Sequence, residues 1–138
     1  MYEKRLIELA LDAREKSYCP YSGFAVGAAL LCQDGTIYTG CNIESSAYTP
    51  TICAERTALF KAVSEGKRDF ICMAVAGGHQ NADVLPITTP CGVCRQVMME
   101  FCNPQTFLVF CASSPDNYKA YTLAQLLPKG FGPMNLGV

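Results

Sequence analysis

The chain has 138 residues, of which 50% are hydrophobic and 17% charged, a balance typical of one compact folded domain and not of a disordered chain. The formal net charge of −1, with no block of Lys or Arg, argues against a binder of polymeric nucleic acid, and no apolar run reaches the roughly 18 residues of a membrane span. Charge is interspersed through the N-terminal MYEKRLIELALDAREK, unlike a signal peptide, so we expect a soluble cytoplasmic protein with a small uncharged partner.

The first half of the chain predicts a helix, a hairpin and a second helix. Apolar residues at helical spacing predict an amphipathic helix over residues 2–16, which the loop SYCPYSGF ends. The pair Asp34-Gly35 predicts a tight turn between two strands within AVGAALLCQDGTIYTGCNI. Residues 52–65 contain good helix formers, and Gly66 stands where a helix C-cap is expected.

The second half predicts buried strands that alternate with helices. FICMAVAG and QTFLVFCA are continuous apolar runs of the kind found in buried central strands. Segment 77–90 contains two glycines and two prolines and predicts a loop, and residues 91–102 predict a helix opened by Pro90. NYKAYTL indicates an edge strand, and Thr122 is placed to cap a short helix at LAQLLP. This order predicts a single domain, residues 1–138, with one α/β sheet covered by helices on both faces.

Nine cysteines, an odd number without a secretory signal, predict mostly free thiols in a reducing compartment. Buried cysteine behaves as a small hydrophobic residue. That interpretation suits the five that lie in apolar runs or at their ends, namely Cys32, Cys41, Cys72, Cys102 and Cys111. The sequence assigns no role to Cys19.

Three further cysteines, Cys53, Cys91 and Cys94, fall at expected helix starts, where free N–H groups and the helix dipole stabilise a thiolate. The Cys-x-x-Cys spacing lets both of its sulfurs point at one cation, and the chain from Cys53 is long enough to return to the same place. Three protein ligands leave the fourth zinc position open for water, as in a catalytic site, whereas a closed structural site needs a fourth side chain. His79, the only histidine, lies in a Gly-rich loop and is more typical of a solvated residue.

Two charged residues follow Cys53 on the same helical turn. Glu55 is placed to take a proton from a water on the zinc and return it elsewhere, although a first-turn Glu also simply favours the helix dipole. Arg56 is placed to donate hydrogen bonds to thiolates and so offset the negative charge of a three-sulfur site. A surface Arg paired with a carboxylate is the alternative for that position.

At this point TICAERTALF and TPCGVCRQV resemble the zinc-dependent cytidine deaminases, specifically the short homotetrameric type. The resemblance extends over nearly the whole chain, from PYSGFAVGAALL through GCNIESSAY to LLPKGF. It implies a three-layer α/β/α sandwich with a central mixed sheet of about five strands. It also implies one Zn²⁺ per chain, held by Cys53, Cys91 and Cys94, with Glu55 as proton shuttle and Arg56 as charge compensation for the thiolates.

The resemblance implies roles for further residues around a bound nucleoside. Phe24 is similar to the aromatic residue that flanks the base, and the backbone of Ala54 would contact the pyrimidine. Asn42 and Glu44 resemble the pair that holds the ribose hydroxyl, in keeping with their amide and carboxylate chemistry. Two aromatic residues are similar to residues at a subunit contact, Phe131 as one contributed by a neighbouring subunit and Tyr48 as an interface residue near it.

The resemblance therefore implies hydrolysis of free cytidine and deoxycytidine to uridine and deoxyuridine plus ammonia, in pyrimidine salvage, by a homotetramer. A structural zinc module or a redox dithiol would also explain the Cys-x-x-Cys, but neither needs Glu55, Asn42 or Glu44 at their positions. A nearer alternative is a deaminase for another substrate, such as a nucleoside-like antibiotic or a base within RNA. The near-neutral charge favours a free nucleoside.

Overall fold

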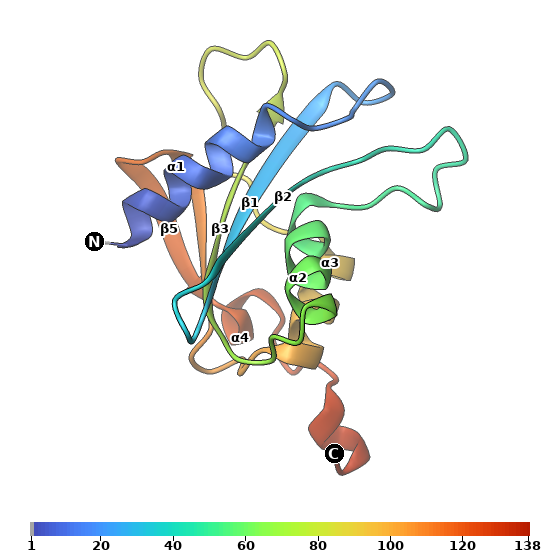
Figure 1. The fold of residues 1–138 in the computed structure, drawn as a ribbon, viewed down its shortest axis with the longest axis vertical. Helices are drawn as coiled ribbons and strands as arrows, with labels where there is room; N and C mark the ends of the chain where they lie inside the picture. Colours follow the sequence, from blue (N-terminus) through green and yellow to red (C-terminus); the bar gives the residue numbers. More distant parts are fainter. Residues whose placement is uncertain (1) are drawn as a thin grey trace.

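The computed structural model describes residues 2–138, so Met1 of the expected 1–138 domain lies outside the described residues. Five strands form one sheet in the order β2-β1-β3-β4-β5. They are β1 (Phe24–Cys32), β2 (Ile37–Cys41), β3 (Phe70–His79), β4 (Leu108–Ser114) and β5 (Asn117–Thr122). The β3–β4 pair is parallel and the other three pairs are antiparallel, so the expected mixed sheet of five strands is confirmed (Figure 1).

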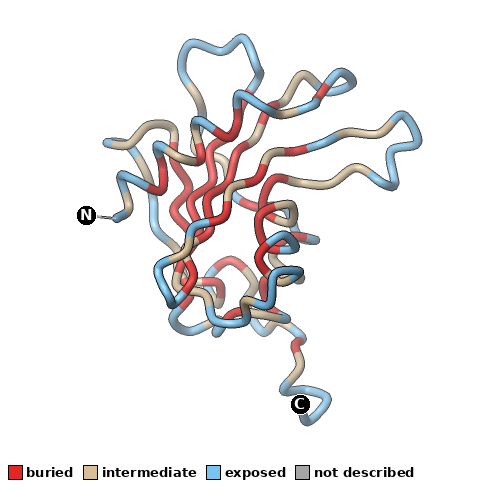
Figure 2. Tube along the Cα trace, viewed as in Figure 1, coloured by how far each residue is buried: buried red, intermediate tan, exposed pale blue. Residues whose placement is uncertain are grey.

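Helices cover both faces of this sheet, which confirms the expected three layers. The helices are α1 (Tyr2–Arg14), α2 (Ala54–Ser64), α3 (Gly92–Phe101) and α4 (Leu123–Leu126), followed by the short 3-10 helix η1 (Pro133–Leu136). The apolar side of α1 packs with Ala29, Ala74 and Phe110 on one face, while α2, α3 and α4 enclose a larger cluster on the other. Buried residues therefore follow the central strands and the inward sides of the helices (Figure 2).

Most helices and strands begin and end near the residues expected from the sequence, with one correction in segment 77–90. Strand β3 continues through His79, so Gly77 and Gly78 belong to the strand and pair with Val26 and Ala25 of β1. Glycine fits there because a Cβ at Gly77 would come within 2.9 Å of the Val26 side chain. The sequence indicated a loop because glycine weakens a strand in isolation, but close packing across the sheet overrides that preference here.

Two expected helix ends are confirmed in detail. Gly66 follows α2 with φ of +94°, a left-handed conformation that favours glycine. Thr122 caps α4, because its side chain accepts a hydrogen bond from the Gln125 amide while the Gln125 side chain accepts one from the Thr122 amide.

Among the cysteines expected in the core, Cys32, Cys72, Cys102 and Cys111 are buried, and Cys19 is buried as well. Cys41 is a correction, since it is only half-buried. It lies on β2, which forms one border of the sheet and therefore lacks a covering strand on its outer side.

Two glycines let helices approach the sheet unusually closely. A Cβ at Gly40 of β2 would come within 2.5 Å of the Ala54 carbonyl oxygen at the start of α2. A Cβ at Gly27 of β1 would lie 2.5 Å from the Arg14 amide nitrogen at the end of α1. Both glycines thus fix where a helix end lies relative to the strands. No helix within residues 2–138 has the length and apolar character needed to cross a membrane.

Candidate active site

The starts of α2 and α3 bring three sulfur atoms together. Cys53 is the N-cap of α2, Cys91 is the N-cap of α3, and Cys94 lies one turn into α3. Their Sγ atoms all lie within 4.8 Å of one another, and those of Cys53 and Cys91 are 3.7 Å apart. Among the His, Cys, Asp and Glu side chains of residues 2–138, no other group of three is arranged in this way. His79 is not part of the cluster, as expected.

The electrostatics of the cluster call for a cation. Hydrogen bonding from Cys94, Arg56 and Cys91 lowers the pKa of Cys53 to about 5, despite its burial. Sharing that proton, together with burial, raises the pKa of Cys94 above its ordinary value. A cation between the three sulfurs would supply positive charge that favours the thiolate form of each cysteine. Three close sulfur donors at helix starts fit Zn²⁺, which prefers thiolate and imidazole ligands.

Arg56 points its guanidinium at the sulfur of Cys53. Its Nη2 atom donates to the Cys53 Sγ atom over 3.3 Å. The Arg56 Nε atom is buried and has no hydrogen-bond partner within residues 2–138. The alternative of a surface Arg paired with a carboxylate does not describe this side chain, because its partner is a sulfur.

Glu55 lies beside the same cluster and is buried, with an exposed fraction of 4%. Removal from water disfavours its charged form and raises its pKa to about 7, and the nearby Cys53 acts in the same direction. A carboxyl group near neutrality can both accept and give back a proton, which is the behaviour of a general base that later acts as an acid. A Glu kept only for the helix dipole would instead lie exposed on the first turn.

A cavity of about 340 Å³ opens directly in front of Glu55 and the sulfurs. Its lining includes Phe24, Asn42, Glu44, Cys53, Glu55 and Cys91. These residues come from β1, from the loop after β2, and from the starts of α2 and α3. The structure thus brings together most of the residues that the sequence marked, around a space of the size of a small ligand.

Asn42 holds the strand that carries Phe24. Its Nδ2 atom donates to the Phe24 carbonyl oxygen over 2.8 Å, and its Oδ1 atom accepts from the Val26 amide over 2.9 Å. An amide has two N–H donors and two acceptor lone pairs, so one donor and one lone pair remain for the cavity. Asn42 therefore positions the wall of the cavity as well as facing it.

Glu44 is the acceptor for the loop that precedes Phe24. Its carboxylate accepts hydrogen bonds from the Ser22 hydroxyl, the Ser22 amide and the Tyr21 amide. These bonds, that of the Ser22 side chain first, hold the pKa of Glu44 below its ordinary value, so the carboxylate stays charged.

Five of the marked residues do not line this cavity: Cys94 and Arg56, which lie at the sulfur cluster, and also Ala54, Tyr48 and Phe131. Ala54 is buried between Cys53 and Glu55 at the start of α2. Tyr48 lines an adjoining cavity of about 370 Å³ and has φ of +64°, which is uncommon for a bulky residue. Phe131 is 57% exposed, and its carbonyl accepts a hydrogen bond from Gln96 of α3.

Sequence reasoning missed several residues around the cavity, Ser22, Thr51, Thr88 and Thr89 among them. Ser22 connects Glu44 to Phe24, because its hydroxyl oxygen also accepts from the Phe24 amide over 3.0 Å. Its place two residues before Phe24, in a loop with Pro20 and Gly23, is the one signal the sequence offers for it. Isolated hydroxyl residues carry too little pattern to be found otherwise.

Known proteins resemble this chain in both sequence and structure. Residues 1–111 match the family model described as the cytidine and deoxycytidylate deaminase zinc-binding region. A cytidine deaminase of Sporosarcina psychrophila is 50% identical over 96% of this chain and 93% of its own, and one of Halalkalibacterium halodurans is 47% identical over 95% of each. A crystal structure of cytidine deaminase from Burkholderia pseudomallei superposes with a TM-score of 0.85 at 43% identity, covering 95% of this chain and 100% of its own.

Proposed function

This chain belongs to the cytidine deaminase family, and we propose that it hydrolyses free cytidine and deoxycytidine to uridine and deoxyuridine with release of ammonia. Family membership makes it a zinc-dependent hydrolase that deaminates cytidine. The extension to deoxycytidine and the roles of single residues are our proposal. The observation that carries it is a buried carboxyl, Glu55, beside a three-sulfur cluster at one end of a cavity of nucleoside size.

We assign the metal to Cys53, Cys91 and Cys94, with one zinc per chain. When zinc is bound, it lowers the pKa of water and so supplies a nucleophile at neutral pH. Arg56, donating to Cys53, offsets part of the negative charge that three thiolates place on the site. Without that offset, the excess negative charge would make a water less acidic.

Glu55 carries the protons in this proposal. It takes a proton from the attacking water and gives it to N3 of the cytosine ring while C4 is attacked. It then takes the remaining proton from the new C4 hydroxyl and passes it to the amino group, which leaves as ammonia while the C4 carbonyl forms. Burial supports this role, because it keeps the pKa of Glu55 close to the pH at which both transfers must occur.

The rest of the cavity orients the nucleoside. We assign Phe24 to one side of the base, the Ala54 backbone to its polar edge, and Asn42 with Glu44 to the ribose hydroxyl. The charged, loop-anchored Glu44 carboxylate is suited to accept from a hydroxyl. Contacts to the 3′-hydroxyl alone would be satisfied equally by ribose and deoxyribose, which is why we expect both nucleosides to react.

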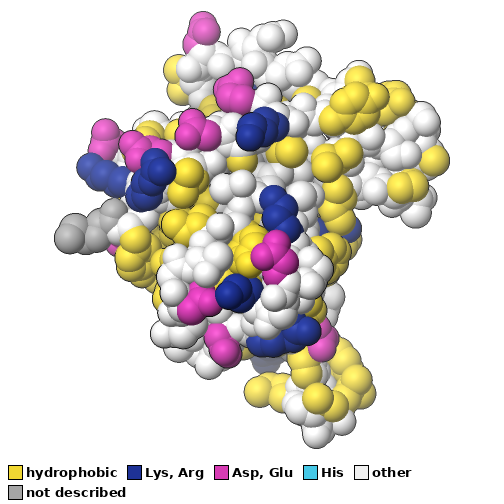
Figure 3. All heavy atoms as spheres, in the orientation of Figure 1, with side chains coloured by type: hydrophobic (Ala, Val, Ile, Leu, Met, Phe, Trp, Pro, Cys, Tyr) yellow, Lys and Arg dark blue, Asp and Glu magenta, His cyan; other side chains and the backbone are white. Residues whose placement is uncertain are grey.

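We further propose that the enzyme is a homotetramer in which Phe131 reaches the cavity of a neighbouring chain, near Tyr48. Exposed apolar residues support this, because they gather on the loops near the cavity and on the C-terminal segment (Figure 3). They are Tyr18, Tyr21, Ile43 and Tyr48 on the loops, and Phe131, Met134, Leu136 and Val138 on the C-terminal segment. Phe131 is absent from the lining of its own chain's cavity.

We place the enzyme in the cytoplasm, in pyrimidine salvage, as one catalytic domain over residues 1–138. All nine cysteines are free thiols, and zinc binding requires that Cys53, Cys91 and Cys94 stay reduced, which suits a reducing compartment. A single sheet joins all five strands, which supports one domain.

The test is a substrate panel followed by absorbance, with the zinc-loaded enzyme and cytidine, deoxycytidine, cytosine and CMP. We expect turnover of both nucleosides, and little turnover of the free base or the phosphorylated nucleotide. Absence of turnover on both nucleosides would overturn the proposal. A preference for a nucleoside-like antibiotic or for a base within RNA, tested alongside, would replace the substrate while leaving the chemistry of Glu55 in place.

A further inference from the structure

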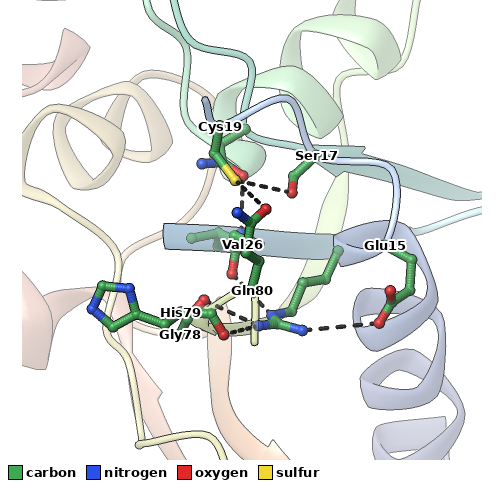
Figure 4. A network of polar contacts seen from close by, with 10 residues as sticks. Glu15, Ser17, Cys19, Val26, Gly78, His79 and Gln80 are labelled. Atoms are coloured by element: carbon green, nitrogen blue, oxygen red, sulfur yellow. Dashed lines mark hydrogen bonds and ion pairs between the residues drawn. The ribbon is translucent and has the colours of Figure 1, made fainter. Parts of the chain in front are cut away.

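Arg14, the last residue of α1, is a buried cation whose partners are backbone carbonyls. Its Nε atom donates to the Ala25 carbonyl oxygen over 3.0 Å, and its Nη2 atom donates to the carbonyl oxygens of Gly78 and His79 over 3.0 and 2.7 Å. The nearest carboxylate, that of Glu15, lies 3.9 Å from Nη1 and is 78% exposed. Figure 4 labels three of the residues that Arg14 contacts, namely Gly78 and His79 at the end of β3 and Glu15 just after α1. Arg14 is thus held mainly by the ends of two strands.

The fold brings Arg14 to this place through a single glycine. Gly27 of β1 has no side chain, and a Cβ there would come within 1.9 Å of the Ala10 carbonyl oxygen and 2.5 Å of the Arg14 amide nitrogen. The last turn of α1 therefore lies directly on β1, and the Arg14 side chain extends along the sheet to its end.

The three carbonyls that Arg14 binds surround the residue proposed to flank the base. Ala25 follows Phe24 in β1, and Phe24 pairs with His79 across the antiparallel β1–β3 ladder. The rings of Phe24 and His79 also contact each other edge-to-face, with centroids 5.9 Å apart and planes at 78°. His79 thus lies against Phe24, and Arg14 fixes its backbone.

Phe24 is held from two directions. Asn42 binds its carbonyl from the cavity side, and the pair of Arg14 and His79 holds the same end of the β1–β3 ladder from the β3 side. The contact from Arg14 and His79 matters because Phe24 is the first residue of β1 and its ring is only half-buried, so few neighbours restrain the ring. An edge-to-face contact is weak, but it discriminates between orientations of a ring.

We propose that Arg14 and His79 are positioning residues, which set the orientation of the Phe24 ring against the pyrimidine. The inference rests on the proposed function, since it assumes that Phe24 flanks the base. Neither residue lines the cavity or belongs to the cysteine cluster. Losing either one should therefore weaken nucleoside binding and leave the chemical step intact.

His79 provides the cleaner test, because its side chain is exposed and its replacement does not threaten folding. In the zinc-loaded oligomer, His79→Ala should raise KM for cytidine about 2- to 10-fold. That range is the free energy of one edge-to-face ring contact converted into a change in affinity. The kcat and the zinc content should stay within about twofold of wild type. His79→Phe should restore KM, because it replaces the ring, and Asn81→Ala, an exposed change in the turn directly after β3, should have no effect.

Arg14→Lys keeps the positive charge but loses the planar fork that reaches three carbonyls. We expect the same rise in KM, with kcat and zinc content retained. Arg68→Lys is the matched control, because Arg68 also donates to two backbone carbonyls, those of Val63 and Lys67, away from the cavity. It should leave KM unchanged.

A double-mutant cycle with Phe24→Leu separates positioning from general loss of structure. If Arg14 and His79 act through Phe24, adding Arg14→Lys or His79→Ala to Phe24→Leu should change KM by less than about twofold. Undiminished effects in that background, or unchanged KM in both single variants, would overturn the inference. If Arg14→Lys fails to fold, the His79 cycle decides. A Phe24→Leu enzyme with wild-type KM would instead refute the proposed role of Phe24.

Discussion

The Sγ atoms of Cys53 and Cys91 lie 3.7 Å apart although 38 residues separate them in the chain. Helix α2, strand β3 and the loop after β3 occupy that interval, and both cysteines are N-caps of helices that start at the same end of the sheet. Helix starts meet there because α2 and α3 both pack on the same sheet face. The candidate zinc site is thus a consequence of topology, and neither helix could form it alone.

Removing one sulfur tests that view of the site. Cys91→Ala should lower bound zinc from one per chain to a small fraction after dialysis against a chelator. Activity should fall by at least about 10²-fold, since even changes beside the ligands cost that much. Zinc is measured by elemental analysis beside activity. The control is Cys41→Ser, at a half-buried cysteine outside the cluster, which should retain both its zinc and its activity. A full zinc content in Cys91→Ala would show that Cys91 is not a zinc ligand.

Arg56 is predicted to tune the site rather than to hold the metal. Arg56→Gln removes the donor to Cys53 Sγ and leaves more negative charge on the thiolates. More negative charge makes water less acidic, so the acidic limb of the kcat profile should move to higher pH. At neutral pH, kcat should fall about 10-fold with zinc retained. The kcat profile of Arg56→Lys should lie between those of wild type and Arg56→Gln. A profile of Arg56→Gln that coincides with wild type would argue against charge compensation.

Sequence reasoning predicted that Cys53, Cys91 and Cys94 would come together, because the chemistry of a zinc site restricts both residue type and spacing. Glu55 and Arg56 followed from Cys53, since they share its helical turn. Arg14 was missed, because an Arg in the last turn of an amphipathic helix ordinarily faces water or the helix dipole. Its burial depends on Gly27, which lies on a different element and carries no signal linking it to Arg14.

Ser22 is predicted to keep Glu44 charged. Because hydrogen bonds from Ser22 depress the pKa of Glu44, the carboxylate persists as pH falls and is lost only through that lowered value. Ser22→Ala raises the pKa toward its ordinary value, so the rise of KM for cytidine on acidification should begin at higher pH. At neutral pH, KM should rise about 2- to 10-fold. Ser64→Ala, at the far end of α2, serves as the control, and coincident KM profiles would contradict the prediction.

The fold was predictable where local signals and packing agree, as at Thr122 and Gly66. It was not predictable at Gly77 and Gly78, because strand pairing with β1 decides their conformation and local composition indicates a loop. Cys41 was expected in the core from its apolar neighbours, but the sequence does not reveal that β2 lies at the border of the sheet. Both errors arise from contacts between residues distant in the chain.

Gly40 is predicted to be essential for docking α2 on β2. A Cβ there would meet the Ala54 carbonyl oxygen at 2.5 Å and the Ala58 amide nitrogen at 2.6 Å, so Gly40→Ala must push the helix away. We expect the free energy of unfolding to fall by about 1–3 kcal/mol in denaturant titrations. Zinc affinity should weaken too, because Cys53 caps this helix. Gly92→Ala, where a Cβ would meet no atom within 4 Å, should change stability by less than about 0.5 kcal/mol, and equal effects of the two would contradict the prediction.

The central claim is that Glu55 carries the protons beside a zinc held by three cysteines, and Glu55→Gln tests it most directly. The amide keeps the size and part of the polarity of the buried side chain but cannot take up a proton. Zinc content and kcat for cytidine should be measured on the same preparation of the variant. We expect one zinc per chain, as in wild type, with kcat lower by about 10²- to 10⁴-fold. A variant that keeps its zinc and turns cytidine over at a rate near wild type would exclude Glu55 as the residue that carries the protons.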